Sequence, residues 1–121
     1  MTVLFRLGSS SIGRTLVGWL FAYFSFLLPV KRLFPSDQVL VFRHPNPSYA
    51  VHVLLIPKLK LRDLDDLCAN DAGMLIEIFQ IAQKLAPQLG LTDSGYRLIY
   101  NGGAYQNFPQ MHFHLIPASD V

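Results

Sequence analysis

A single segment of this chain has the hydrophobic period of a helix, and short strand-like runs flank it on both sides. Between Asn70 and Gly90, apolar residues recur every three or four positions, and polar residues fall on the opposite side. Asn70 is suited to cap this helix and Gly90 to end it, and Pro87 is expected to kink or end its last turn. The apolar positions are Leu75, Ile78, Phe79, Ala82, Leu85, Ala86 and Leu89. One long helix among several strands predicts an α+β fold.

Runs of apolar and β-branched residues predict where the strands lie. The longer runs cover residues 38–42, 50–56, 96–100 and 111–117, and a shorter run covers 30–34. Pro45 and Pro47 interrupt the chain between the runs at 38–42 and 50–56, because proline cannot donate to a strand ladder. Residues 59–67 form a charged connector that leads to the helix.

The composition limits the chain to one small folded domain. Of its 121 residues 51% are hydrophobic and 15% are charged, a balance that excludes intrinsic disorder. Ten Lys and Arg against eight Asp and Glu give a net charge of +2, far from the dense basic surface of a nucleic-acid-binding protein. The lone cysteine, Cys68, can form no internal disulfide and supplies no zinc site by itself. No nucleic-acid partner is therefore expected.

The N-terminal part differs in character from the rest of the chain. Residues 1–32 carry four basic residues and no acidic one, and sixteen uncharged residues separate Arg14 from Lys31. A transmembrane helix needs about 17–25 apolar residues, so this run is slightly short. A signal peptide fits poorly, because no small-residue cleavage site follows the run. Three interpretations stay open: a minimal membrane anchor, a helix in the membrane interface, and a helix packed against the domain or a partner subunit.

We therefore divide the chain into a hydrophobic N-terminal helical segment, residues 1–34, and a folded domain, residues 35–121. The expected location is the cytoplasm, with membrane contact through residues 15–30 left open.

The last strand carries the residues that point to chemistry. Polar and apolar residues alternate strictly from Gln110 to Leu115, and strand side chains point to opposite faces with a period of two. Gln110, His112 and His114 should therefore share one face. The other face, which should pack on the helix, carries Met111, Phe113 and Leu115. Two imidazoles and an amide on a face that no core requires form a candidate site.

The loop before this strand suits an anion. Asn101, Gly102 and Gly103 open it, and the paired glycines let backbone N–H groups approach a phosphate without a Cβ in the way. Gln106 and Asn107 offer amide donors later in the same loop. Beside the two histidines, this loop predicts a phosphate pocket.

Taken together, residues 37–117 resemble a histidine triad (HIT) domain, whose signature is His-φ-His-φ-His-φ-φ, where φ is apolar. Here Gln110 stands at the first histidine position of that signature, and His112 and His114 stand at the second and third. An earlier family pattern, Ala/Pro-x-His-x-Leu-x-Ile-Pro-Lys, is matched by residues 50–58, with His52 at its histidine. The resemblance implies a five-stranded antiparallel sheet with one long helix, paired as a symmetric homodimer.

The resemblance also implies chemistry at the α-phosphorus of a nucleotide. His112 occupies the position of the family nucleophile, and a neutral imidazole is a competent nucleophile near pH 7. The family holds the other ring nitrogen on a backbone carbonyl, here that of Gln110. His114 would bind phosphate oxygens and hold the site positive, and His52 would complete the cluster.

The remaining family positions fall in the loop and after the first strand. The amides of Gly102 and Gly103 would offset charge on the transferring phosphoryl group. Asn107 stands where the family places a hydroxyl residue near the leaving group. His44 stands where many members have an aspartate that binds the ribose hydroxyls. Gln110 departs from the family as well, because an amide cannot exchange a proton at neutral pH.

The resemblance therefore implies a hydrolase or nucleotidyl transferase acting on nucleotide phosphoramidates or dinucleoside polyphosphates through a nucleotidyl-histidine intermediate. It implies no metal and no cofactor. One alternative is a non-catalytic nucleotide-binding module, because the departures at Gln110 and His44 could have removed activity. Another is a metal-dependent β-barrel protein of the cupin type, which also uses His-x-His on a strand. Metal sites of the cupin type use a Glu a few residues after the His-x-His pair, and the only acidic residue after His114 is Asp120.

Overall fold

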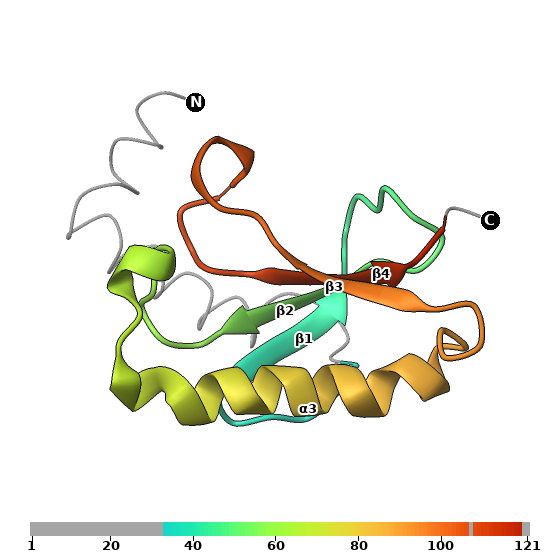
Figure 1. Cartoon of the computed structure of the whole chain (residues 1–121), viewed down its shortest axis with the longest axis horizontal. Helices are drawn as coiled ribbons and strands as arrows, with labels where there is room; N and C mark the ends of the chain where they lie inside the picture. Colours follow the sequence, from blue (N-terminus) through green and yellow to red (C-terminus); the bar gives the residue numbers. More distant parts are fainter. Residues whose placement is uncertain (1–32, 107, 120–121) are drawn as a thin grey trace.

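The computed structural model describes residues 33–106 and 108–119, which form one antiparallel sheet with a long helix along one face (Figure 1). The elements in chain order are β1 (Val39–Arg43), β2 (Val53–Pro57), η1 (Leu64–Asp66), η2 (Ala69–Asp71), α3 (Ala72–Gln88), β3 (Tyr96–Tyr100), η3 (Gly103–Tyr105) and β4 (Phe113–Pro117). The predicted α+β class is confirmed. The hydrophobic N-terminal helix expected within residues 1–34 lies almost entirely outside the described residues. Within these residues, no helix has the length and apolar character to cross a bilayer.

The sheet has the strand order β1-β2-β4-β3, with every neighbouring pair antiparallel. The last strand in sequence, β4, lies inside the sheet, where His114 is opposite Leu54 of β2 and Ile99 of β3. This insertion pairs β2 with β4, so that Val53 lies opposite Leu115, although about 60 residues separate the two in the chain.

The described residues contain four strands, and the expected fifth strand at residues 30–34 is not seen among them. Leu33 and Phe34 lie in a bend, and the rest of that run lies outside the described residues. The N–H of Leu33 still donates to the carbonyl of Val41 at 2.9 Å, so this bend lies along the outer edge of β1.

The helix begins and ends close to the predicted residues. Asn70 lies in η2 and does not cap α3, because the short 3₁₀ turn delays the helix to Ala72. Pro87 is accommodated inside the last turn, and the helix ends one residue later at Gln88. Gly90 then adopts a φ of +72°, and the N–H of Leu91 donates back to the carbonyl of Ala86 at 2.9 Å, as in a Schellman motif.

The core lies between α3 and the sheet. As predicted, Met111, Phe113 and Leu115 face the helix and belong to its core cluster. The buried stripe of α3 is rotated from the predicted one, since Phe79 is 59% exposed. The side chains that do face the sheet are Met74, Ile78, Ile81, Ala82, Leu85 and Ala86. The opposite face of the sheet has a smaller buried cluster of Leu40, Leu54 and Ile56, against which Phe42 packs.

Candidate active site

Four imidazoles converge at the end of β1, the start of β2 and the start of β4. His44 directly follows β1, His52 directly precedes β2, His112 directly precedes β4, and His114 lies within β4. Because β2 and β4 pair, the rings of His52 and His114 lie with centroids 5.0 Å apart, and His112 lies 5.1 Å from His114. His44 stacks on His52 at 4.4 Å, with 27° between the ring planes. The structure thus brings together all four histidines of the sequence.

Strand β4 begins later than predicted. Its first residue is Phe113, so Gln110 and His112 lie on the segment that leads into the strand, and only His114 of the three belongs to it. The side chains of Gln110, His112 and His114 are all buried, with 2%, 9% and 9% exposed. The first part of the predicted strand instead follows the connector, through a bond from the N–H of Met111 to the carbonyl of Leu61 at 2.7 Å.

The ring of His112 is held by its own chain. Its Nδ1 lies 2.8 Å from the carbonyl oxygen of Gln110. A carbonyl can only accept, so Nδ1 is the protonated nitrogen of the neutral ring. The lone pair of His112 therefore resides on Nε2. This is the tautomer that a nucleophilic imidazole requires.

A second hydrogen-bonded chain fixes the other two rings. The backbone N–H of Ser48 donates to Nδ1 of His52 at 3.2 Å, so the neutral His52 ring carries its proton on Nε2. That Nε2 lies 2.8 Å from Nδ1 of His114 and donates to it. The proton of neutral His114 is therefore on Nε2. This buried N–H has no hydrogen-bond partner within the part of the chain that the structure describes.

Burial and neighbouring imidazoles lower the pKa values of His44, His52 and His114. Burial, followed by the charges of His112, His52 and His44, lowers the pKa of His114 to about 4. Burial and the neighbouring imidazoles lower the pKa of His52 and of His44 in the same way. The lowered pKa favours a neutral His114 near pH 7 in the ligand-free protein, whereas the resemblance implied a positive charge there. His114 presents an N–H dipole at neutral pH.

His44 is half-buried at the rim of the cluster. The backbone N–H of Asn46 donates to its Nδ1 at 3.0 Å, so the neutral ring has its N–H at Nε2. His44 therefore offers one N–H donor at the position where an aspartate would offer two acceptor oxygens.

The glycine-containing loop begins directly after β3 with Asn101. Gly103 adopts a φ of +59°, which favours glycine, and a Cβ on Gly102 would lie 3.2 Å from the ring of Tyr100. The backbone conformation thus favours glycine at Gly103, whereas at Gly102 a side chain would require a small shift of the Tyr100 ring. Asn107 lies outside the described residues.

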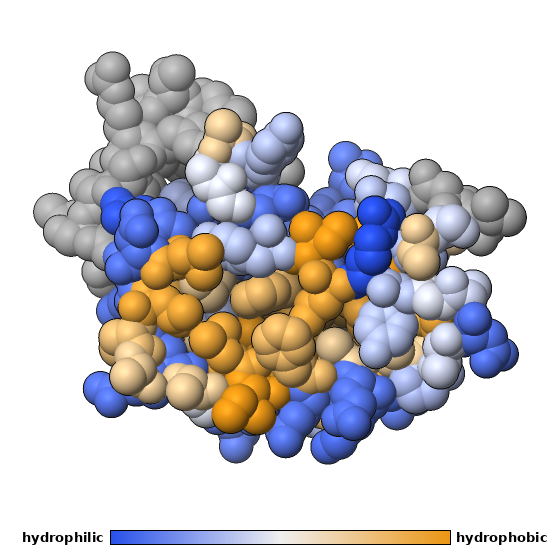
Figure 2. All heavy atoms as spheres, in the orientation of Figure 1, coloured by the Kyte–Doolittle hydropathy of each residue, from blue (hydrophilic) through white to orange (hydrophobic). Residues whose placement is uncertain are grey.

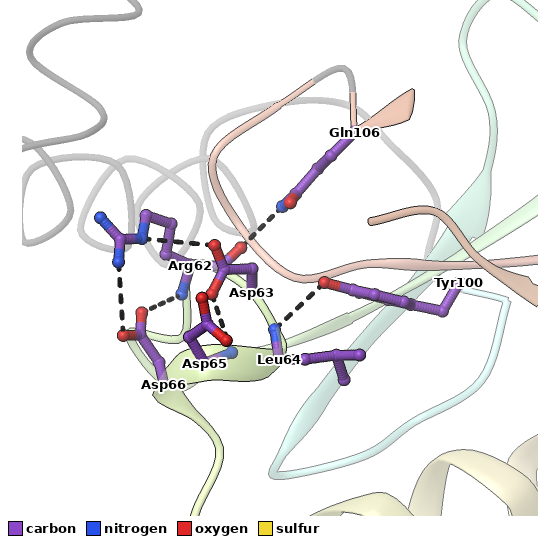
Figure 3. Close-up of polar contacts among 7 residues, drawn as sticks. All are labelled: Arg62, Asp63, Leu64, Asp65, Asp66, Tyr100 and Gln106. Atoms are coloured by element: carbon purple, nitrogen blue, oxygen red, sulfur yellow. Dashed lines mark hydrogen bonds and ion pairs between the residues drawn. The ribbon is translucent and has the colours of Figure 1, made fainter. Parts of the chain in front are cut away.

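The two glutamines predicted at the site donate to backbone carbonyls at the end of β2 and in the connector that leads to α3. Gln106 donates from Nε2 to the carbonyl of Arg62 at 2.6 Å, beside the ion pairs of Arg62 with Asp63 and Asp66 (Figure 3). Gln110 donates from Nε2 to the carbonyls of Pro57 and Leu59, at 3.0 and 2.8 Å. No sequence pattern marks these contacts, because their acceptors are backbone carbonyls, which are the same for every residue type.

Metal binding was a rival interpretation of the histidines. Across residues 33–106 and 108–119, no three or more His, Cys, Asp or Glu side chains are grouped so that they could hold a metal ion.

Several known proteins are similar to this chain in sequence and in fold. The HIT domain family matches residues 28–121. The purine nucleoside phosphoramidase of Escherichia coli (strain K12) is 31% identical over 91 residues, which cover 74% of this chain and 76% of that protein. A HIT family hydrolase from Clostridium thermocellum superposes with a TM-score of 0.76 at 33% identity, covering 84% of this chain and 91% of that one. A HIT family hydrolase from Legionella pneumophila gives a TM-score of 0.72 at 31% identity, covering 78% and 87%.

Proposed function

The chain belongs to the HIT domain family, and we propose that it hydrolyses nucleotide phosphoramidates or dinucleoside polyphosphates, with His112 as the nucleophile at the α-phosphorus. The observation that carries this proposal is the bond from Nδ1 of His112 to the carbonyl of Gln110, which leaves the lone pair on Nε2. The similarity to a purine nucleoside phosphoramidase favours phosphoramidates of purine nucleotides as the first substrates to test.

The proposed reaction has two displacements at phosphorus. In the first, the Nε2 lone pair of His112 forms a bond to the α-phosphorus, and the bond to the leaving amine breaks. The amine takes that electron pair and a proton from solvent water. In the second, a water oxygen bonds to phosphorus and loses a proton, and the electron pair of the P–N bond returns to Nε2. The nucleotide is released as its monophosphate.

Three sets of groups are proposed to assist this reaction. The unpartnered Nε2–H of His114 is suited to donate to a phosphate oxygen, and His52 fixes its tautomer. The backbone amides of Gly102 and Gly103 are candidates for further contacts to the phosphate, together with Asn101, Gln106 and Asn107. His44 is the candidate contact to the ribose, with a single N–H donor.

A symmetric homodimer is part of the same proposal. Strand β3 lies at the edge of the sheet, and among the described residues only β4 pairs with it. Figure 2 shows apolar side chains gathered in one patch that reaches from the level of the sheet down onto α3. Exposed apolar side chains include Ile76 and Phe79 of α3 and Tyr96 of β3. A two-fold contact through such a surface would cover both the edge strand and apolar area.

A steady-state assay tests the activity. Wild-type protein should release ammonia and AMP from adenosine 5′-phosphoramidate, and should do so equally well with a chelator present. His112→Ala should reduce kcat by at least ~10³-fold while the fold is kept. Cys68→Ser, at an exposed position outside the cluster, should match the wild type. If wild-type protein binds the nucleotide without turnover, the alternative of a non-catalytic nucleotide-binding module is correct.

A further inference from the structure

The last residue of β2, Pro57, and the connector that follows it hold the segment that carries His112. The carbonyls of Pro57, Leu59 and Leu61, at alternate residues, all accept hydrogen bonds from Gln110 and Met111. Two of these bonds come from the side-chain amide of Gln110 and one from the backbone of Met111. The end of β2 and the connector therefore continue the pairing of β2 with β4, irregularly, along the two residues that precede His112.

Gln110 contacts both the connector and the nucleophile. Its side-chain Nε2 donates to the carbonyl of Pro57, at the end of β2, and to that of Leu59 in the connector, at 3.0 and 2.8 Å. Its backbone carbonyl accepts the Nδ1–H of His112 at 2.8 Å. With 2% of the residue exposed, water cannot readily replace either amide bond. The orientation of this carbonyl is thus fixed by the side chain of the same residue.

We propose that Gln110 is a positioning residue, whose buried amide clamps the backbone to the connector so that its carbonyl holds His112 in the attacking tautomer and orientation. The inference rests on the proposed function only in taking His112 to be a nucleophile that attacks phosphorus. The clamp itself is a property of the ligand-free protein.

A histidine cannot replace this clamp. A neutral imidazole has one N–H donor, whereas the amide of Gln110 has two, both in use. The sequence alone favours a rate gain for Gln110→His on poor leaving groups, because it adds a group that exchanges protons. The geometry favours the reverse, since one connector carbonyl would lose its donor and the carbonyl that holds His112 would be less constrained.

The test combines ¹⁵N NMR of the histidine rings with steady-state kinetics. In ligand-free wild-type protein, the His112 signals should show protonated Nδ1 and unprotonated Nε2. In Gln110→Met, which keeps the length of the side chain and removes both donors, His112 should populate both tautomers. The ring of His52, held by the N–H of Ser48, should stay in its Nε2–H form and so report an intact fold. We expect kcat to fall roughly 10- to 100-fold with KM changed less than about twofold, as for a displaced catalytic group.

Tyr100→Phe is the matched control. It removes a different hydrogen bond to the connector, from the N–H of Leu64 to the Tyr100 hydroxyl at 3.2 Å, and leaves Gln110 untouched (Figure 3). The His112 tautomer and kcat should stay at wild-type values in this variant. An equal change in Tyr100→Phe would mean that any loosening of the connector has the same effect, and would overturn the specific role of Gln110.

The remaining outcomes also decide the question. Wild-type tautomer and kcat in a folded Gln110→Met would overturn the proposal. If Gln110→Met does not fold, Gln110→His carries the test, because it keeps one of the two bonds and should show a smaller change of the same kind. A wild-type tautomer and an unchanged or raised kcat in Gln110→His would then overturn it. If wild-type protein shows no turnover, the proposed function fails, and the NMR measurement alone still supports or overturns the clamp.

Discussion

The four-imidazole cluster couples the stability of the domain to pH, and His114 is the group with the largest effect. Its ring is buried, accepts a hydrogen bond at Nδ1 from Nε2 of His52, and lies near the other three imidazoles. Folding lowers its pKa from 6.5 to about 4. The unfolded chain therefore binds a proton at this residue more readily than the folded chain does between these two values.

The sign and size of the effect follow from this difference. The stabilising contribution of neutral His114 is fully present above pH 6.5 and is lost as the pH falls toward 4. A shift of this size corresponds to about 3 kcal/mol in total, of which about 2 kcal/mol is lost between pH 7.5 and pH 5. His52 and His44, whose pKa values are also lowered, act in the same direction.

His114→Gln isolates this contribution. An amide oxygen can accept the Nε2–H of His52, as Nδ1 of His114 does, and it does not titrate. Urea unfolding at several pH values between 4.5 and 7.5 gives the free energy of unfolding of both proteins. The wild type should lose about 2 kcal/mol more than His114→Gln between pH 7.5 and pH 5. Parallel pH dependences of the two proteins would refute the reasoning, because they would show that His114 has a similar pKa in both states.

Three further predictions concern separate parts of the molecule. Gly103→Ala should lower the free energy of unfolding in urea by roughly 1 kcal/mol, because the φ of +59° strains an alanine although no atom crowds the new Cβ. Gly73→Ala within α3 should raise it by about 0.5 kcal/mol, and equal effects of the two substitutions would contradict the backbone argument. Phe79→Lys should shift the mass measured by light scattering from dimer to monomer, and an unchanged mass would exclude this part of α3 from the interface. Deletion of residues 1–28 should raise solubility and release the protein from membranes, and an insoluble, unfolded product would favour a helix packed against the domain.

Much of the fold was predictable because hydrophobic period and turn residues act locally. The helix and the positions of four strands follow from patterns within a few residues. The rotation of the helix face does not, because Phe79 lies one position away from the stripe of Ile78, Ile81, Ala82 and Leu85 that the sheet selects. An apolar residue at the margin of a stripe is assigned only by tertiary packing.

The convergence of the histidines was predictable from the resemblance, whereas their hydrogen bonds were not. The tautomers of His52 and His114 depend on the backbone N–H of Ser48, and the position of Gln110 depends on carbonyls of the connector. Backbone donors and acceptors are the same for every residue type, so no sequence pattern marks them. The low pKa of His114 likewise arises from burial that only the folded chain provides.

The most direct test of the proposed mechanism is the location of the covalent adduct. Wild-type protein would be mixed with adenosine 5′-phosphoramidate, denatured within the first turnover and digested at mildly alkaline pH, where phosphoramidate bonds to histidine persist. Peptide mass spectrometry should then find an adenylyl group on His112 and none on His52 or His114. An adduct on another residue, or turnover with no adduct on any residue, would contradict the assignment of His112 as the nucleophile.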